Sequence, residues 1–389
     1  MIVFVVRRFR KTSGHEYARI FSYLLSGDPD KFNPNTDLKS QLPILPYNEK
    51  REVPRSAFEV GDPIGSGNFG NVHKGEINGM YTKDSKTTIA IKSISGHADD
   101  NELEHFLYEI KIMGFVDPHL NLVSMIGSCT RNLDTDRELW LLLEFCEYGD
   151  LKKYLIKNKD QILSGAKSEL INSRCLVLWL YGVAKGMEYL ARNQIMHGDL
   201  AARNVLLDKD PFGLGYPIAK VADFGLSKKF DQNMQNYVKD EETSRTMVPW
   251  KWMALEYLLD GFLTLKSDVW SFGVLLWEMM SFGRIPYGQQ GYEDLVTKLE
   301  NGYRLPCPKD IKVISGWSPE ALYTKLSKMC FVEEHDERGS FSDLVNIIED
   351  ELSQEERNRC RDMDEMYAST YAENYIRFGQ AQNALKNNG

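Results

Sequence analysis

The chain has 389 residues, with 47 Lys and Arg against 56 Asp and Glu, so its formal net charge is −9. Its 42% hydrophobic and 26% charged residues are the balance of a soluble globular protein, which excludes a disordered acidic tail or a collagen-like fibre. The acidic balance also argues against nucleic acid as a partner, because domains that bind it electrostatically are usually basic.

The first residues have the pattern of the cytoplasmic end of a membrane helix. Residues 2–6 are all apolar, and four basic residues follow without an acidic one, namely Arg7, Arg8, Arg10 and Lys11. Positive charge on the cytoplasmic side is typical of membrane-spanning helices. A frayed terminus with chance charges is the alternative, and the segment alone leaves both open.

From residue 57 onward the pattern predicts strands, because short β-branched or apolar runs alternate with glycine and polar turns. The predicted strands cover residues 58–64, 72–77, 88–94, 122–126 and 139–145. Residues 102–113, after the third of these strands, predict a helix.

After Gly149 the pattern becomes helical. Apolar residues between Leu176 and Leu190 recur at helical spacing and form one apolar face. Residues 269–280 are apolar nearly all round, which predicts a helix buried in a core. A strand-rich part followed by a helix-rich part indicates an α+β fold with two lobes.

A glycine-rich segment lies between the first two predicted strands. Gly65, Gly67 and Gly70 form the pattern G-x-G-x-x-G, in which glycines let the backbone turn tightly and approach phosphate oxygens. Strand-like residues follow, whereas a dinucleotide-binding loop would start a helix. Alone, a glycine-rich hairpin is structural more often than not, so the functional interpretation depends on other motifs.

Lys92 lies within the apolar run Ala90-Ile91-Lys92 of the third predicted strand. A buried ammonium group is costly unless it is paired. Glu109, in the following helix, is the expected partner, and the pair would hold the ammonium where it neutralises phosphates. The alternative is an edge-strand lysine that faces water.

Two further motifs carry the oxygen atoms that phosphoryl transfer requires. Asp199, in His197-Gly198-Asp199, can accept the hydrogen bond of an attacking hydroxyl and then its proton. Asn204 and Asp223, the latter in Asp223-Phe224-Gly225, offer oxygen ligands for Mg²⁺. Each piece alone could be a turn or a cap, but their occurrence in this order indicates phosphoryl transfer.

With these motifs in this order, the chain resembles a protein kinase catalytic domain. It resembles tyrosine kinases in particular, because Ala201 stands where serine/threonine kinases usually carry a lysine and residues 247–256 resemble the tyrosine-kinase substrate platform. Residues 45–50 and 118–123 are similar to receptors of the platelet-derived and vascular endothelial growth factor receptor type. Residues 157–173 are shorter than the insert usual in those receptors.

The resemblance implies a two-lobed protein-kinase fold over residues 56–350. The N-lobe (56–146) would hold an antiparallel sheet plus one helix, and the C-lobe (147–350) would be mainly helical. The resemblance also favours the end of a truncated transmembrane helix with basic stop-transfer residues at 1–11. The remaining segments would be a juxtamembrane linker at 12–55 and a C-terminal tail at 351–389.

The resemblance also assigns roles to individual residues. Asp199 would be the catalytic base, supported in catalysis by Lys92, Glu109, Arg203, Asn204 and Asp223. Asn204 and Asp223 would bind Mg²⁺, with Mn²⁺ as the alternative ion. ATP would be bound by the glycine-rich loop, the adenine pocket, the gatekeeper Leu143 and the hinge, namely Ile64, Gly65, Gly67, Gly70, Val72, Ala90, Lys92, Leu143, Glu144, Cys146 and Leu206.

Two structural pairs are expected from the same resemblance: Asp268 should brace the catalytic loop, and Glu256 should pair with Arg338. One departure is Gly198, which replaces the usual arginine beside the catalytic Asp, so we expect activity with altered activation-loop control. Residues 208–219 are an apparent insertion, which we interpret as a surface loop.

Tyr237 is the expected autophosphorylation site, and an unmodified surface tyrosine is the alternative. Four further tyrosines could become docking sites for phosphotyrosine-reading domains, namely Tyr47, Tyr367, Tyr371 and Tyr375. The last three also share one face of a helix, so packing against the domain is an equal alternative.

We therefore expect a protein tyrosine kinase that transfers the γ-phosphoryl group of Mg-ATP to tyrosine hydroxyls of proteins, including its own. It would be the cytoplasmic part of a plasma-membrane receptor. Its partners would be tyrosine-containing substrate proteins, phosphotyrosine-reading adaptors and a second copy joined through a missing ectodomain. The alternatives are a pseudokinase scaffold, for which only Gly198 argues, and a cytosolic non-receptor tyrosine kinase.

Overall fold

The computed structural model describes residues 25–28, 30–33, 41–67, 70–80, 85–94, 100–131, 138–164, 173–210, 216–224, 249–309, 318–367 and 369–370. The chain divides into two units. The first comprises Met1–Pro118, Ser124–Phe145 and Ala368–Gly389, and the second comprises His119–Val123 and Cys146–Tyr367.

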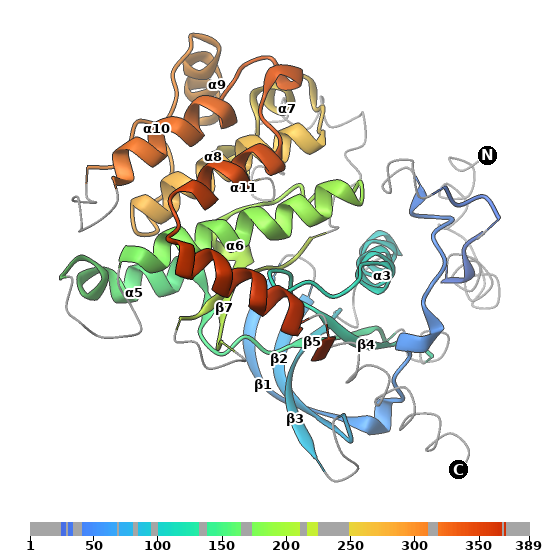
Figure 1. Ribbon diagram of the computed structural model, residues 1–389. Helices are drawn as coiled ribbons and strands as arrows, with labels where there is room; N and C mark the ends of the chain where they lie inside the picture. Colours follow the sequence, from blue (N-terminus) through green and yellow to red (C-terminus); the bar gives the residue numbers. More distant parts are fainter. Residues whose placement is uncertain are drawn as a thin grey trace. The chain divides into compact units, whose positions relative to one another are not determined.

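The first unit contains a five-stranded sheet and one long helix (Figure 1). The strands are β1 (Phe58–Gly67), β2 (Gly70–Asn78), β3 (Lys86–Ser93), β4 (Met125–Cys129) and β5 (Trp140–Glu144). They are ordered β1-β2-β3-β5-β4, and every neighbouring pair is antiparallel. The helix is α3 (Asp100–Phe115), so the predicted helix in this part of the chain is confirmed.

The core of this sheet is built from β-branched and aliphatic side chains, which pack well on a pleated surface. Ile77, Ile89 and Leu142 come from three different strands and are fully buried. Burial on one face makes the strand register specific, because a shift by one residue would turn these side chains outward.

The fourth strand differs from its prediction. The sequence predicts residues 122–126, whereas β4 spans Met125–Cys129. Leu122 instead forms a parallel bridge with Val221, and the Val123 N–H donates to the Val221 carbonyl at 2.9 Å. The prediction was wrong because this backbone is used by a strand of the second unit, a long-range pairing that a local pattern does not reveal.

Residues 41–57, which the sequence assigns to a linker and to the start of the domain, pack onto the first unit as a strap. The strap includes two short helices, η3 (Glu49–Arg51) and η4 (Arg55–Ala57), and it buries Leu45 and Val53 completely. The Val53 N–H donates to the Ser128 carbonyl at 2.7 Å, and Lys111 Nζ of α3 donates to the Leu42 carbonyl at 3.1 Å. This part of the chain is therefore tied to both β4 and α3.

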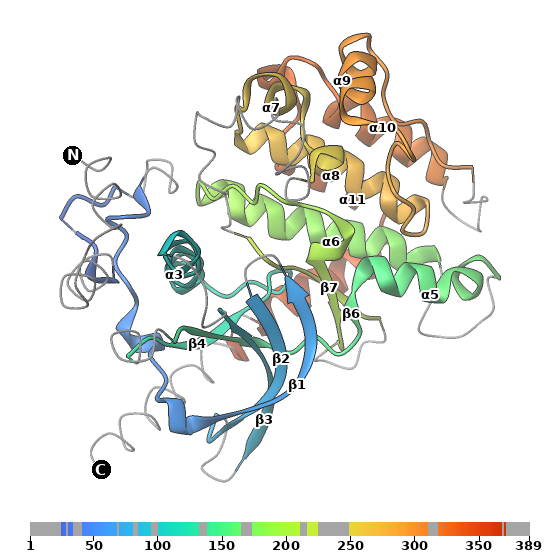
Figure 2. The same cartoon turned by 180° about the vertical axis from the view of Figure 1, so that it is seen from behind.

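The second unit is mainly helical (Figures 1 and 2). Its helices are α5 (Leu151–Ser164), α6 (Ser173–Arg192), α7 (Leu255–Asp260), α8 (Leu265–Met280), α9 (Tyr292–Glu300), α10 (Pro319–Cys330) and α11 (Phe341–Asp350). A small antiparallel sheet is ordered β6 (Gly149–Asp150), β7 (Val205–Asp208) and β8 (Ile218–Val221). Together with the first unit, this arrangement confirms the predicted α+β class.

Helix α8 is the buried helix that its composition predicts. A capping box starts it: the Thr264 side chain accepts the Ser267 N–H, and the Ser267 hydroxyl accepts the Thr264 N–H. Nearly all its residues from Ser267 to Met280 are buried. Apolar residues all round a helix are stable only when neighbours cover every side.

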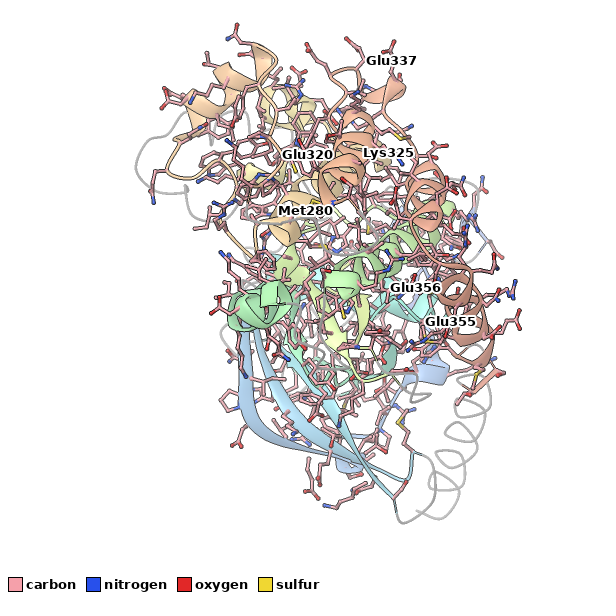
Figure 3. The ribbon with its side chains drawn as sticks, turned by 60° about the vertical axis from the view of Figure 1, so that its left-hand side comes forward. Met280, Glu320, Lys325, Glu337, Glu355 and Glu356 are labelled. Carbon is pink, nitrogen blue, oxygen red and sulfur yellow. The ribbon has the colours of Figure 1, made fainter. Side chains whose placement is uncertain are left out.

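A helix at residues 354–367 follows α11 within the second unit (Figure 3). Arg174 Nε of α6 donates to Glu356 at 2.8 Å, and Arg359 lies 3.3 Å from Asp210. The apparent insertion at 208–219 includes parts of two strands, because Asp208 ends β7 and Ile218 begins β8. Residues 211–215 between them lie outside the described residues.

Among the residues that the structure describes, no helix is both long and apolar enough to cross a membrane. Residues 1–11, where the sequence analysis expects the end of such a helix, are not among them.

Candidate active site

The Lys92–Glu109 ion pair expected from the sequence is present in the first unit. Lys92 Nζ of β3 lies 2.6 Å from Glu109 Oε1 of α3, and the two side chains are 8% and 1% exposed. The alternative of a water-facing edge lysine is therefore wrong. A buried ion pair is tolerated because each charge compensates the other's lost hydration, so α3 holds the ammonium group at a set place on the sheet.

The glycine-rich segment includes the paired ends of β1 and β2. Gly67 ends β1, Gly70 starts β2, and the two residues pair directly. Gly70 has φ of +148°, and a Cβ at this position would collide with the carbonyl oxygen of Ser93. Glycine is thus required here, which agrees with the argument against a helix-starting dinucleotide loop.

The candidate metal ligands, Asn204 and Asp223, lie near the same end of a second hairpin. Asn204 directly precedes β7 and Asp223 follows β8, whose strands pair Val205 with Val221. The N–H of Ala222, next to Asp223, donates to the Asn204 carbonyl at 2.8 Å. Antiparallel pairing thus brings two residues 19 positions apart to adjacent backbone.

Asp199, the predicted base, is held by two neighbours in the same loop. Asn204 Nδ2 donates to the Asp199 carbonyl at 2.7 Å and to Asp199 Oδ2 at 2.9 Å. The Arg203 guanidinium bonds to the other carboxylate oxygen, Oδ1. The Asp199 side chain remains 34% exposed, so an acceptor hydroxyl can approach an oriented carboxylate.

Asp268 braces this loop from α8, as the resemblance implied. Its two oxygens accept the backbone N–H groups of His197 at 2.7 Å and Gly198 at 2.9 Å. Burial raises the pKa of the Asp268 carboxyl, and the two N–H groups partly oppose this shift. Gly198 has φ of +75°, a left-handed conformation that glycine adopts without a steric cost.

His197 links the same loop to the segment after β8. Its Nδ1 accepts the Asp199 N–H at 3.2 Å, so its Nε2 is the ring nitrogen that donates to the Ala222 carbonyl at 3.0 Å. The ring is fully buried. His197 therefore connects the residue before Asp223 with the backbone of Asp199.

The donor set fits a magnesium ion with a nucleotide. Because Asn204 Nδ2 faces Asp199, the amide oxygen Oδ1 is the atom left for a metal, and Asp223 adds a carboxylate. Among the described residues, no group of three or more His, Cys, Asp or Glu side chains could hold a metal ion. Mg²⁺ usually takes only one or two protein ligands and completes its shell with phosphates and water.

The residues predicted to contact adenine belong to both units. Within the first unit, Ala90 of β3 pairs with Leu143 of β5, and Val72 of β2 pairs with Lys92. The side chain of Glu144 accepts the Ser124 N–H at 2.7 Å, and its own N–H donates to the Ser124 carbonyl at 3.0 Å. Ile64 also lies in the first unit, and Cys146 and Leu206 lie in the second. Tyr237, the predicted phosphorylation site, lies outside the described residues.

Glu278, a carboxylate in the apolar helix α8, was not predicted as a functional residue. Its Oε2 accepts the Ala202 N–H at 2.9 Å and the Trp252 Nε1–H at 2.8 Å, and only 1% of the residue is exposed. Burial raises the pKa of this carboxyl. The sequence feature that could have predicted it is an acidic residue inside a nearly all-apolar run, since a buried charge needs specific partners.

Comparisons with known proteins agree with these observations. A family model described as protein tyrosine and serine/threonine kinase matches residues 58–348. The tyrosine kinase receptor Cad96Ca of Drosophila melanogaster is 32% identical over 304 residues, 77% of this chain and 36% of that protein. Fibroblast growth factor receptor 1 of Xenopus laevis is 34% identical over 313 residues, 78% of this chain and 36% of that protein. The chain thus spans about a third of the length of these curated relatives.

Proposed function

Because the chain belongs to the protein tyrosine and serine/threonine kinase family, we propose that it transfers the γ-phosphoryl group of ATP to tyrosine hydroxyls of proteins, including its own. The predicted kinase fold is confirmed by the family match together with the five-stranded sheet and the helical second unit. The observation that carries the proposed activity is the hydrogen-bonded cluster of Asp199, Arg203 and Asn204.

In this proposal Asp199 receives the acceptor. The phenol hydroxyl donates a hydrogen bond to the carboxylate while its oxygen attacks the γ-phosphorus. The new O–P bond forms as the bond to the β-phosphate oxygen breaks, ADP leaves, and the phenolic proton passes to Asp199. Arg203 and Asn204 hold both carboxylate oxygens, so the base is oriented before the acceptor arrives.

Lys92 is proposed to contact the nucleotide phosphates, and Glu109 to position it. The ammonium group supplies positive charge where negative charge accumulates, which is the main requirement of phosphoryl transfer. Glycine backbone at Gly65, Gly67 and Gly70 would add N–H donors. Mg²⁺, held by Asn204 Oδ1 and the Asp223 carboxylate, would supply charge neutralisation at the phosphates.

We further propose that the chain is the cytoplasmic part of a receptor at the plasma membrane, since both named relatives are receptors by their titles. Substrate proteins, phosphotyrosine-reading adaptors and dimerisation with a second copy belong to the same proposal. The finer resemblance to platelet-derived and vascular endothelial growth factor receptors remains a prediction.

The activity is tested by incubating the purified chain with Mg-ATP and a tyrosine-containing peptide, and by mapping phosphotyrosine with mass spectrometry. Asp199→Asn should lower the rate by about 10²- to 10⁴-fold, the usual contribution of a general base. Asp336→Asn, at a position 91% exposed, is the matched control and should retain full activity. The same spectra would show whether Tyr237 is modified.

Two results would count against the proposal. Equal phosphotyrosine formation by wild type and Asp199→Asn would remove Asp199 as the base. A folded wild-type protein that forms no phosphotyrosine would favour the pseudokinase alternative, for which Gly198 is the one sequence argument.

A further inference from the structure

Glu278 joins two segments that are 50 positions apart in the sequence. One is η5 (Ala202–Asn204), which directly follows the loop of Asp199, and the other is η7 (Trp250–Trp252). A single oxygen, Oε2, accepts a hydrogen bond from each, 2.9 Å from Ala202 N and 2.8 Å from Trp252 Nε1. Within the part of the chain that the structure describes, Oε1 is buried and has no hydrogen-bond partner.

A buried carboxylate with one unpaired oxygen is costly in free energy, and helix stability does not require it. An apolar residue would suit the surrounding helix α8 better, because that helix is covered on every side. The carboxylate therefore contributes something other than packing, and its two hydrogen bonds show which segments depend on it.

Trp252 is fixed by three independent contacts. Its indole N–H donates to Glu278, its carbonyl accepts the Ser271 hydroxyl at 2.8 Å, and its ring lies 4.7 Å from the Arg203 guanidinium carbon. Glu278 and Ser271 both lie on α8. The buried helix α8 thus sets the position of this indole ring.

Arg203 connects Trp252 with Asp199, the candidate base. Its guanidinium stacks on Trp252 and bonds to Asp199 Oδ1, and the Arg203 and Asp199 side chains are each 34% exposed. The Arg203–Trp252 pair therefore lies next to the carboxylate that would receive the acceptor hydroxyl. The planar ring of a tyrosine can stack on that pair, whereas the short side chain of serine offers no such surface.

We propose that Glu278 is a positioning residue for the acceptor tyrosine: it fixes the Arg203–Trp252 pair, which receives the phenol ring beside Asp199. The inference rests on the proposed function and deepens it, because it names the residues that favour a phenol over an aliphatic hydroxyl. Glu278 acts through Trp252 and the Ala202 backbone and does not itself touch the acceptor.

The experiment compares Glu278→Ala, Glu278→Gln and Trp252→Phe with wild type. Binding of a fluorescent tyrosine peptide is measured by anisotropy without ATP, and the steady-state constants for peptide and ATP are measured separately. Glu278→Ala should weaken peptide binding and raise the peptide KM about tenfold or more, the loss expected for a charge-assisted hydrogen bond, with the KM for ATP unchanged. Glu278→Gln, which keeps an oxygen acceptor, should restore most of this loss.

Two further measurements separate positioning from a merely structural role. Glu278→Ala combined with Trp252→Phe should be no worse than Glu278→Ala alone, because both changes remove the same hydrogen bond. The ratio of kcat/KM for a tyrosine peptide to kcat/KM for the same peptide with serine should fall in Glu278→Ala. Glu188→Gln replaces another buried helical carboxylate, which bonds Arg192 and Ser342, and is the matched control that should change neither constant.

The inference is overturned if folded Glu278→Ala binds the peptide as tightly as wild type does, or if its KM values for peptide and ATP rise together. It is also overturned if the losses of peptide binding caused by Glu278→Ala and Trp252→Phe add up in the double variant. Failure of the proposed function looks different: wild type then forms no phosphotyrosine. In that case the anisotropy measurement still tests the role of Glu278. Peptide binding that depends on Glu278 supports the inference, whereas absence of peptide binding rejects the inference together with the proposed function.

Discussion

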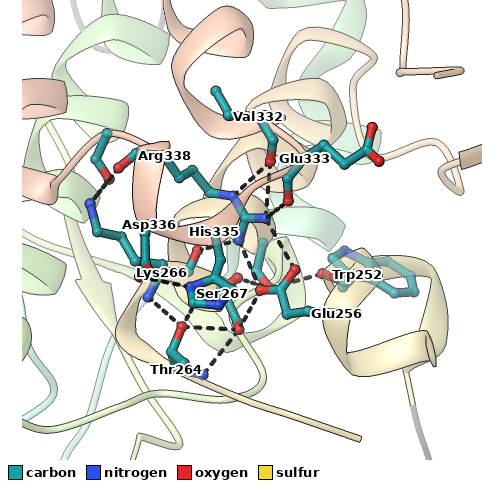
Figure 4. A network of polar contacts seen from close by, with 12 residues as sticks. Trp252, Glu256, Thr264, Lys266, Ser267, Val332, Glu333, His335, Asp336 and Arg338 are labelled. Atoms are coloured by element: carbon teal, nitrogen blue, oxygen red, sulfur yellow. Dashed lines mark hydrogen bonds and ion pairs between the residues drawn. The ribbon is translucent and has the colours of Figure 1, made fainter. Parts of the chain in front are cut away.

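Arg338 and Glu256 form a two-pronged ion pair across 82 positions of sequence, with Nη1 2.9 Å from Oε1 and Nη2 3.1 Å from Oε2 (Figure 4). Arg338 is almost completely buried and also donates to the carbonyls of Lys266 at 2.8 Å and Val332 at 3.0 Å. Burial acts to raise the pKa of Glu256, but the hydrogen bonds and charge of Arg338 outweigh it, so this pKa lies below its ordinary value. The pair therefore stabilises the folded state above the ordinary carboxyl pKa, and this contribution is lost as the pH falls through the lowered value.

Replacing Arg338 by Met should destabilise the protein by about 3–5 kcal/mol, because Glu256 would keep a buried charge without its partner. The free energy of unfolding in urea measures the loss. Arg192→Met is the control, since Arg192 is 69% exposed in its pair with Glu188 and such pairs contribute little. An equal loss of unfolding free energy in Arg338→Met and Arg192→Met would show that burial of the ion pair does not determine its contribution.

Lys111 should make stability depend on pH. Burial lowers the pKa of this ammonium group to about 7, although Glu104 acts in the opposite direction. Between that value and the ordinary lysine pKa the unfolded chain binds the extra proton, so stability should rise with pH, by at most about 1.4 kcal/mol per pH unit from this group. Lys111→Met should flatten the rise when unfolding is measured at pH 7, 8 and 9. If the free energy of unfolding rises equally with pH in wild type and Lys111→Met, other titratable groups cause the rise.

Asp268→Ala should impair the loop that carries Asp199 more than it impairs the rest of the unit. The substitution leaves the buried N–H of His197 without an acceptor, at a cost of about 1–3 kcal/mol, and also removes the acceptor of the partly buried Gly198 N–H. Hydrogen exchange at these two amides should accelerate, while amides in α6 keep their protection. Unchanged exchange at His197 would show that the brace is dispensable.

Tyr47 should be a poor phosphorylation site in the folded protein. Its hydroxyl bonds to the Glu52 carboxylate and to Ser128 Oγ at 2.8 Å, and burial together with Glu52 raises its pKa. A phosphate there would face the Glu52 carboxylate, whose oxygens already accept the Thr130 N–H at 3.0 Å and hydroxyl at 2.9 Å. An added tyrosine kinase should modify a peptide of residues 42–53 but leave Tyr47 unmodified in the whole chain, as read by mass spectrometry. Stoichiometric modification without a fall in melting temperature would refute this.

Local patterns were sufficient for several parts of this protein. The lysine inside an apolar strand predicted an acidic partner, and the observed partner is Glu109. The apolar residues 269–280 predicted the buried helix α8, and the Gly-rich segment between two strand-like runs predicted a hairpin. These features depend on residues close in sequence, or on a single cost, such as burial of a charge, that an acidic residue of the following helix can offset.

The parts that sequence did not reveal depend on distant backbone. The start of β4 was misplaced because Asn121 and Val123, on either side of Leu122, hydrogen-bond to Val221, about 100 positions away. The packing of the strap was not predicted because its buried contacts, such as Val53 with Ser128, are equally non-local. Glu278 was overlooked because its partners, Ala202 and Trp252, lie on two segments that no periodicity relates to α8.

The helix at residues 354–367 has a practical consequence for anyone who shortens this chain. Its last described turn places the Tyr367 ring 4.7 Å from Nζ of Lys220, a nearly inaccessible lysine on β8 three positions before Asp223. A fragment that ended at Asp350 would lack the Tyr367 ring that packs against Lys220 of β8, the strand before Asp223. It would also lack Glu356, the ion-pair partner of Arg174. Recombinant versions should therefore extend past Tyr367, and shorter ones should aggregate more and melt earlier for reasons unrelated to catalysis.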